Sequence, residues 1–279
     1  MVFYDNIDVA INGSGILAES ASIAQVNYLA PAYILEKRGE MSQPVKDSIR
    51  SKIDIGYLVE VDHEPSLGIV NSIKEFRTDD HDAKPFVVEV ANISGSFYLE
   101  DYQLRIQPNQ TVKASASFVS YDPLSGDVST KRVGSEAINY NQTNSLAHGW
   151  TTYVTNSGVA REIPTYSFEY QFRASWNPIY AIGQPFPRQV QLLNAGEMIV
   201  ITKDDYKHVQ FSGQKAGDAF ASEYGNDLVV EAVRLNLLCD SDTGKCLQIG
   251  MSGGVVVNSR LQANIGDMVR NKIGINRNY

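Results

Sequence analysis

The chain has few basic residues, and it does not gather them into a cluster. Its 24 Lys and Arg are outnumbered by 32 Asp and Glu, which gives a formal net charge of −8 over 279 residues. Because a surface that grips phosphates needs clustered Lys and Arg, this balance disfavours a dedicated nucleic-acid-binding surface. An acidic wall could still face DNA that has to slide past without sticking, since like charges repel each other.

Long apolar runs are also missing. The sequence contains no stretch of about 18 apolar residues that could cross a membrane as a helix. The opening residues, Met1 to Asn6, lack both the basic stretch and the apolar core of a secretory signal. We therefore expect a protein that is soluble when folded, is made in the cytoplasm and has no membrane partner.

Cysteine occurs only twice, at Cys239 and Cys246. The residues between them include a glycine, so the two side chains could face each other across a hairpin and form a disulfide. A cytoplasmic chain gives no pressure toward that oxidation, and the disulfide stays an open alternative. Two cysteines are too few ligands for a metal site, and we expect neither a metal nor a cofactor.

Motifs that carry chemistry are incomplete. The segment Gly250–Gly254 matches the G-x-S-x-G pattern of hydrolases around Ser252, but the apolar residues after it predict a strand where that motif needs a helix. We therefore expect a hairpin turn at Ser252–Gly254. The acidic run Asp79–Asp82 is typical of a solvated loop, and Asp240–Gly244 lacks the later ligands of a calcium loop. We expect no catalytic residue and no enzyme.

What the chain does have is alternation with a period of two. Odd positions from Ile49 to Val61 are mostly apolar and even positions mostly polar, which is typical of a long strand with one wet face. Tyr166 to Arg173 alternates aromatic and polar residues in the same way. Turn-forming residues separate further candidates, so the sheets should be largely antiparallel. Those candidates are 87–92, 104–106, 112–119, 198–202, 228–238, 246–251 and 255–265.

Helical spacing is rare by comparison. Apolar residues recur at roughly helical intervals only from Ser66 to Phe76, directly after Pro65, and more weakly from Ala216 to Tyr224. The sequence therefore predicts a mainly β protein with one or two short helices packed on antiparallel sheets.

The two halves of the chain repeat a spacing of apolar residues. Hairpins with the same internal spacing begin at Leu104 and Leu247, and a long alternating strand that ends before a proline lies upstream of each. These upstream strands are 53–65 and 166–178. The repetition predicts two copies of one β-module, although chance spacing remains an alternative because residue identity is low.

The predicted modules are residues 1–130 and 131–279. The second module is longer, with an insertion near 184–225. The segment between them, 126–135, has few large apolar residues and is typical of a linker or a long loop.

Several segments of the sequence resemble the virion proteins that form the tail tube of bacteriophages. They are Ile7–Gly13 with Ala18–Ile23, Ser96–Tyr102 with Val112–Phe118, and Tyr166–Tyr170 through Asn177–Gly183. The likeness is spread over most of the chain and rests on patterning, without a diagnostic motif. It implies an antiparallel β-barrel or sandwich of the tail tube type.

In that family, neighbouring subunits complete a continuous inner β-barrel, and rings stack into a channel for DNA. Ring closure suits antiparallel sheets in general, because it pairs the N–H and C=O groups that an open sheet edge leaves exposed. The two long strands would then be the natural inter-subunit strands. Their candidate contact residues are Ile53, Ile55, Tyr57, Tyr166, Phe168 and Tyr170.

The resemblance also implies partners and a location. We expect the chain to pair with copies of itself in a stacked ring of three or six chains, in the tail of a virion, next to other tail or neck proteins. DNA would be a transient cargo that does not adhere to a neutral or acidic inner wall. Two alternatives remain open: another phage structural component from the neck, baseplate or capsid, and a carbohydrate-binding adhesive β-domain.

Overall fold

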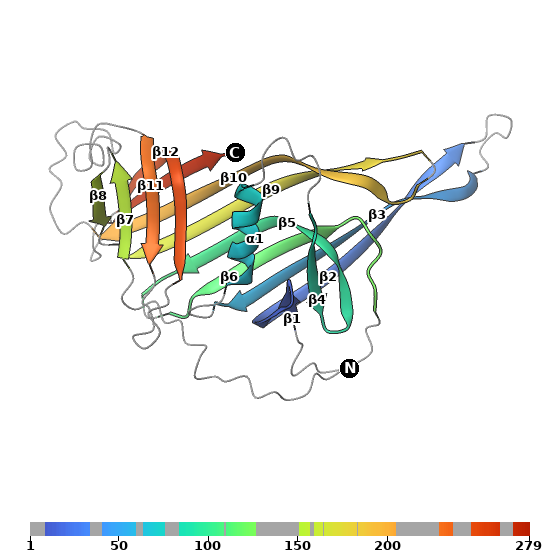
Figure 1. Cartoon of the computed structure of the whole chain (residues 1–279), viewed down its shortest axis with the longest axis horizontal. Coiled ribbons are helices and arrows are strands. Elements are labelled where there is room, and N and C mark those ends of the chain that lie inside the picture. Colours follow the sequence, from blue (N-terminus) through green and yellow to red (C-terminus); the bar gives the residue numbers. More distant parts are fainter. Residues whose placement is uncertain are drawn as a thin grey trace.

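The computed structural model describes residues 9–33, 41–59, 64–75, 84–108, 110–126, 151–156, 159–163, 165–182, 184–204, 229–236, 247–262 and 270–279. These residues form thirteen strands in one sheet, with every pairing antiparallel, and one α-helix (Figure 1). The predicted mainly β class with a short helix is confirmed. No helix in the described part of the chain is long and apolar enough to span a membrane.

The helix and the strands have the following bounds along the chain. The helix α1 covers Pro65–Lys74. The strands are β1 (Val9–Ile11), β2 (Ser14–Tyr33), β3 (Met41–Leu58), β4 (Phe86–Val90), β5 (Ile93–Ile106), β6 (Lys113–Ser120), β7 (Thr151–Asn156), β8 (Val159–Ile163), β9 (Ser167–Tyr180), β10 (Pro187–Asp204), β11 (Val229–Asn236), β12 (Gln248–Gln262) and β13 (Arg270–Asn278).

The N-terminal half, β1–β6, is a closed six-stranded antiparallel barrel. Its strands pair in the order β1-β2-β3-β6-β5-β4, and β4 pairs back with β1. The β1–β2 hairpin turns through Asn12 and Gly13, whose φ angles of 53° and 79° suit the tight turn that an Asn-Gly pair favours. The barrel that the sequence predicted as one of two architectures is therefore present.

The C-terminal half, β7–β13, follows the same strand order. The β7–β8 hairpin matches the β1–β2 hairpin, and β7 pairs with β11 as β1 pairs with β4. The order β9-β10-β13-β12-β11 then repeats the order β2-β3-β6-β5-β4. Strands β8 and β9, with only residues 164–166 between them, together hold the place of the single long strand β2.

Even an irregularity of the sheet recurs. The register of β5 against β6 shifts between Leu99 and Asp101, and that of β12 against β13 shifts between Val256 and Asn258. A β-bulge of this kind adds one residue to one strand and increases the local twist. Because the bulge recurs in the corresponding pair of strands, it can be used to align the residues of one half with those of the other.

This strand order changes the correspondence that spacing alone had indicated. The sequence matched residues 166–178 with 53–65, whereas β9 holds the place of β2, and β10 holds the place of β3. Residues 187–204, which were expected to belong to an insertion, form β10. The expected boundary at 130/131 lies outside the described residues, and the division into domains there stays a prediction.

The predicted turn at Ser252–Gly254 is wrong. β12 runs without reversal from Gln248 to Gln262, pairing first with β11 and then, from Val255 onward, with β13. The φ angle of Gly253 is 81°, and a Cβ atom on Gly254 would lie 2.7 Å from Ile275 Cγ2. The two glycines therefore let the strand pass closely over β13 while it changes partner.

The helix α1 lies across one face of the sheet (Figure 1). Pro65 starts it, where a missing N–H costs nothing, and the carboxylate of Glu64 accepts a hydrogen bond from the Ser66 N–H at 3.2 Å. Its buried residues include Leu67, Val70 and Ile73, which join a core that contains residues of both halves. The prediction of a helix in this segment is confirmed, and the weaker one at 216–224 lies outside the described residues.

Candidate assembly surface

The two halves are joined by one pair of strands. β5 pairs with β4 through its first residues, Ile93 to Phe97, and with β9 through its last, from Asp101 to Ile106. The bulge at Glu100 lies between these two stretches. One strand thus closes its own barrel with one part and binds the other half with the rest; we call the β5–β9 pairing the joint.

The inner face of the joint is apolar and fully covered. Leu104 lies opposite Tyr170, and the rings of Tyr102 and Tyr170 are 6.1 Å apart at their centroids. Both tyrosines and Leu104 have no exposed surface. Because each large apolar side chain contributes about 1.5–3 kcal/mol when fully buried, this face is the main source of stability in the joint.

The outer face of the joint is held by charges of opposite sign on the two strands. Arg173 Nε lies 2.9 Å from Asp101 Oδ2, and Arg105 Nη2 lies 3.3 Å from Glu169 Oε1. Gln103 also donates a hydrogen bond to Glu169. These pairs are solvent-exposed to different degrees, so each contributes at most about 1 kcal/mol and acts mainly on the choice of register.

The same charge balance extends along the neighbouring strands. Carboxylates and cations alternate there, and the oppositely charged atoms lie within 3.0 Å of each other. A cation that contacts a carboxylate attracts a phosphate more weakly, because the carboxylate repels the phosphate at the same time. The further pairs are Arg50–Glu100, Lys52–Asp54 and Lys113–Glu19.

Several strands keep an edge without a partner in the described part of the chain, among them β2 and β12. β2 pairs with β1 only through Ile16, so one edge from Leu17 onward is paired with nothing described. β12 pairs with β11 only through Val255, and from there to Gln262 its only described partner is β13. Exposed edges of this length are the surfaces through which sheets join each other.

The predicted inter-subunit residues lie inside the sheet. Ile53, Ile55 and Tyr57 belong to β3, which has β2 on one side and β6 on the other. Phe168 and Tyr170 belong to β9, between β5 and β10. Tyr166 directly precedes β9, and its N–H donates to Thr202 O at 2.6 Å. β9 does join the two halves, but it does so within one chain.

A buried ion pair locks α1 onto the other half. Lys74, in the last turn of α1, pairs with Glu197 of β10, and the Tyr170 hydroxyl donates to the same carboxylate at 2.7 Å. The Tyr279 hydroxyl donates to its other oxygen. Burial lowers the pKa of Lys74, and the Glu197 charge opposes that effect. Sequence reasoning missed this site, because the residues of the pair are far apart in the chain.

The other end of α1 holds a second buried carboxyl group. The Tyr57 hydroxyl lies 2.5 Å from Glu64 Oε1 and 2.6 Å from Ser66 Oγ. Burial is the main cause that raises the pKa of Glu64 to about 7, while hydrogen bonds from Tyr57 and Ser66 act in the opposite direction. A carboxyl group with such a pKa can mark a catalytic site. Here its contacts are those of a helix cap.

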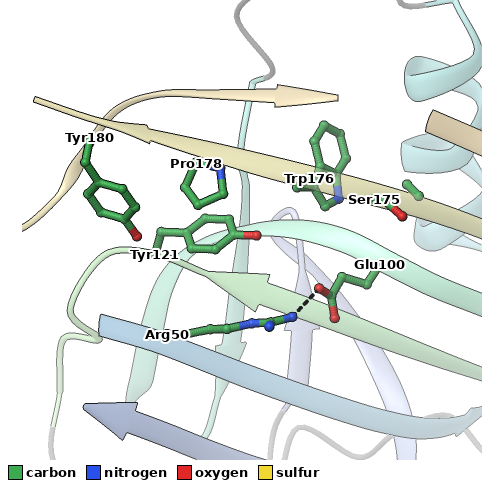
Figure 2. Close-up of a pocket in the computed structure, with 8 residues that line it drawn as sticks. Arg50, Glu100, Tyr121, Ser175, Trp176, Pro178 and Tyr180 are labelled. Atoms are coloured by element: carbon green, nitrogen blue, oxygen red, sulfur yellow. Dashed lines mark hydrogen bonds and ion pairs between the residues drawn. The ribbon is translucent and has the colours of Figure 1, made fainter. Parts of the chain in front are cut away.

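A hollow of about 420 Å³ opens where β9 leaves β5 (Figure 2). Aromatic rings and the Arg50–Glu100 pair line it. Trp176 is already engaged there, because its Nε1 donates to Leu99 O at 2.8 Å and its ring lies 5.2 Å from that of Tyr98. The ring therefore serves the packing between β5 and β9.

None of the other chemical motifs is completed as a catalytic or metal site by the described residues. Ser252 lies within β12, and its Oγ accepts a hydrogen bond from Arg277 Nη1 at 2.5 Å. Asp79–Asp82, Asp240–Gly244, Cys239 and Cys246 lie outside the described residues. In the ranges that are described, no three metal-binding side chains form a group.

Comparison with known proteins adds no relative to this picture. No protein-family model matches the chain, and no curated protein sequence is significantly similar to it. The function of the chain is therefore inferred from the geometry of its sheet and from the resemblance of its sequence to tail tube proteins.

Proposed function

We propose that this chain is a structural virion protein that forms rings with copies of itself, and that these rings stack into a phage tail tube for the passage of DNA. The observation that supports the proposal most is the joint between β5 and β9. Within one chain, this pairing already joins two halves that have the same strand order, through one edge of each half. Repetition of such a contact between chains is how identical subunits form closed rings.

The number of chains follows from the repetition. Each chain contributes two halves of the same order, so three chains supply six of them. A ring of six like units is what the resemblance to tail tube proteins implies for a duplicated chain. We therefore favour three chains over six, and closure of the ring would leave neither β2 nor β12 with an open edge.

The charge of the sheet suits a wall along which DNA slides. Every phosphate contact that a wall retains would release counterions and tighten adhesion. On the face that carries the joint, Arg173, Arg105 and Lys113 each contact a carboxylate. With the net charge of −8, this pairing supports a neutral to acidic inner surface and a DNA cargo that does not adhere.

We propose no catalytic role for the chain. Ser252 lies in a strand and contacts Arg277, and a nucleophile elbow would place it between a strand and a helix. A serine-directed covalent probe should leave Ser252 unlabelled. Stoichiometric labelling at that residue would contradict this part of the proposal.

Two alternatives make different predictions. A neck, baseplate or capsid adaptor would form a particle of bounded size and would never stack. A carbohydrate-binding domain would bind glycans as an isolated chain, and the hollow of Figure 2 is the place for them. The contacts of Trp176 with Leu99 and Tyr98 count against that use, because stacking on a sugar needs an open aromatic face.

Negative-stain electron microscopy of the concentrated protein separates these functions. The proposal predicts rings with a central opening, and stacks of such rings at the highest concentrations. Rings that never stack would favour the adaptor. Monomers that bind a glycan array would favour the carbohydrate-binding domain.

A further inference from the structure

We infer that the contact between chains repeats the joint within the chain, so that β12 of one chain pairs antiparallel with β2 of the next. This inference rests on the proposed ring and names its interface. The occupant of each of these two edges is therefore a second copy of this chain. The residue-by-residue match between the two halves supplies the register.

The first step identifies β12 as the counterpart of β5. Each strand pairs at its start with the strand before it in the chain, β4 or β11, and each has a bulge directly after that stretch. After the bulge, β5 takes β9 as its partner. After the corresponding bulge, β12 has no described partner on that edge, so no described strand holds beside β12 the position that β9 holds beside β5.

The second step identifies the residue of β2 that holds the place of Tyr170. Starting at the bulge of the N-terminal half, Leu99 faces Phe118, Phe118 faces Ile53, and Ile53 faces Ile23. In the C-terminal half, also starting at the bulge, Val256 faces Ile275, Ile275 faces Ile199, and Ile199 faces Tyr170. Tyr170 therefore holds the place of Ile23.

Together these steps fix the register between chains. Leu104 follows Leu99 at the same distance as Leu261 follows Val256, and Leu104 faces Tyr170 in the joint. Leu261 should therefore face Ile23 of the next chain. One position along, Gln103 faces Gln171, and the corresponding pair between chains is Arg260 and Ala24.

The burial of the β2 edge agrees with this assignment. Tyr170, covered by β5, has no exposed surface, whereas its counterpart Ile23 packs against the core and remains only partly buried. Ser51 holds the place of Glu197, two residues before Ile53 and Ile199. Its Oγ is buried without a hydrogen-bond partner among the described residues, while Glu197 receives Lys74 from the other half. Ser51 has no exposed surface and is already enclosed within its own chain, whereas Ile23 keeps the partial exposure expected of an edge that a second chain would cover.

Disulfide trapping in the full chain tests the register. We would combine Ala24→Cys with Arg260→Cys, oxidise the assembled protein, and map the linked peptides by mass spectrometry, which separates them from any linkage of Cys239 or Cys246. The expected product is a disulfide between chains. The matched control is Gln103→Cys with Gln171→Cys, which occupies the equivalent pair in the joint and should link within one chain.

A shifted pair tests how specific the register is. Ala24→Cys with Gln262→Cys is displaced by two residues, and such diagonal neighbours are about 7–8 Å apart. Disulfides rarely bridge Cα atoms more than about 7 Å apart. We expect the shifted pair to link at least tenfold more slowly than the pair in register.

The outcomes separate this inference from the function on which it rests. If rings form and the Gln103→Cys/Gln171→Cys control links, absence of the disulfide between positions 24 and 260 overturns the inference and leaves the proposed function standing. If the unmodified protein forms no rings, the proposed function fails, and the inference fails with it.

A charge series gives a second readout if cysteine variants fold poorly. Ala24 is exposed, so Ala24→Lys should fold normally. The new lysine would lie opposite Arg260 of the next chain, and repulsion between the two cations should reduce the fraction of assembled protein severalfold at low salt. Ala24→Glu should not reduce it. Arg260→Glu should restore assembly of Ala24→Lys. Equal assembly of all these variants would overturn the inference.

Discussion

Lys74 and Glu197 show how much one residue pair contributes to holding the two halves together. Their side chains are 14% and 0% exposed, so removal of one partner leaves a buried charge without compensation. We expect Lys74→Met to lower the free energy of unfolding by about 3–5 kcal/mol, as measured by urea denaturation.

The matched control for that variant is Lys52→Met. Lys52 pairs with Asp54 on the open face, where both side chains are nearly half exposed. An exposed pair contributes at most about 1 kcal/mol. Equal losses in the two variants would contradict the assignment of Lys74 as the residue that locks α1 onto β10.

Glu64 should make the folded chain less stable as pH rises, which is the reverse of the usual effect of a carboxyl group. Its pKa is raised from 4.5 to about 7 in the folded chain, so between these values the folded state holds a proton that the unfolded state has lost. The free energy of unfolding should therefore fall as pH rises from about 5 to about 7, by on the order of 1 kcal/mol per pH unit, and the contribution should be constant above that range.

Glu64→Gln is the control, because glutamine resembles the protonated carboxyl and does not titrate. Chemical denaturation at a series of pH values should show the decline between pH 5 and 7 in the unmodified protein and a weaker decline in the variant. Parallel curves for the two proteins would show that Glu64 does not titrate in this range.

The sequence predicts few of the contacts that individual residues make. Glu197 directly precedes the predicted strand 198–202, and nothing in the sequence there distinguishes a buried carboxylate from one in water. Its partner Lys74 is distant in the chain and meets it only because α1 crosses the joint. Burial of a charge depends on that meeting, and local periodicity does not report it.

Among the elements, β12 makes the strictest demand on its sequence. Gly254 lies so close to Ile275 and Met251 that a Cβ atom would approach their side chains to 2.7 and 2.8 Å. We expect Gly254→Ala to lower the free energy of unfolding by about 1–3 kcal/mol, because a packed core resists added volume.

The control for this variant is Gly15→Ala in β2, where an added Cβ would meet no atom within 4 Å. That substitution should change stability by less than about 1 kcal/mol. Thermal unfolding of both variants gives the comparison. A Gly254→Ala protein as stable as the Gly15→Ala protein would contradict the close passage of β12 over β13.

The elements were predictable where one face is wet and the other is buried. Ile53, Ile55 and Phe168 alternate with polar neighbours, and the strands that carry them are confirmed. β12 was misread because two adjacent glycines usually mark a turn, and here they serve close packing. Most of β10 was missed, since residues 187–197 mix polar and apolar side chains without a clean period.

For the whole molecule, apolar spacing in the sequence indicated a repeat but matched 53–65 with 166–178, which do not hold the same place in the two halves. Spacing along a chain does not show which strands pair with each other, and the common order of the two halves becomes clear only from the pairing itself. The open edges of β2 and β12 were equally hidden, because an edge is defined by the absence of a neighbour in space.

The proposed assembly should tolerate salt. Backbone pairing and apolar burial would supply most of its interface, as they do in the joint, and exposed ion pairs are screened within about 8–10 Å at ordinary ionic strength. Assembly that disappears at moderate salt would instead favour an interface held by charge.

The mass of the assembled protein shows whether the chain forms a ring with copies of itself. Light scattering of the purified chain should be recorded over a wide range of concentrations, at low and at high salt. We expect a species of three times the 30.8 kDa mass of one chain, with larger multiples as rings stack. A folded protein that keeps the mass of a single chain at every concentration and ionic strength would contradict it.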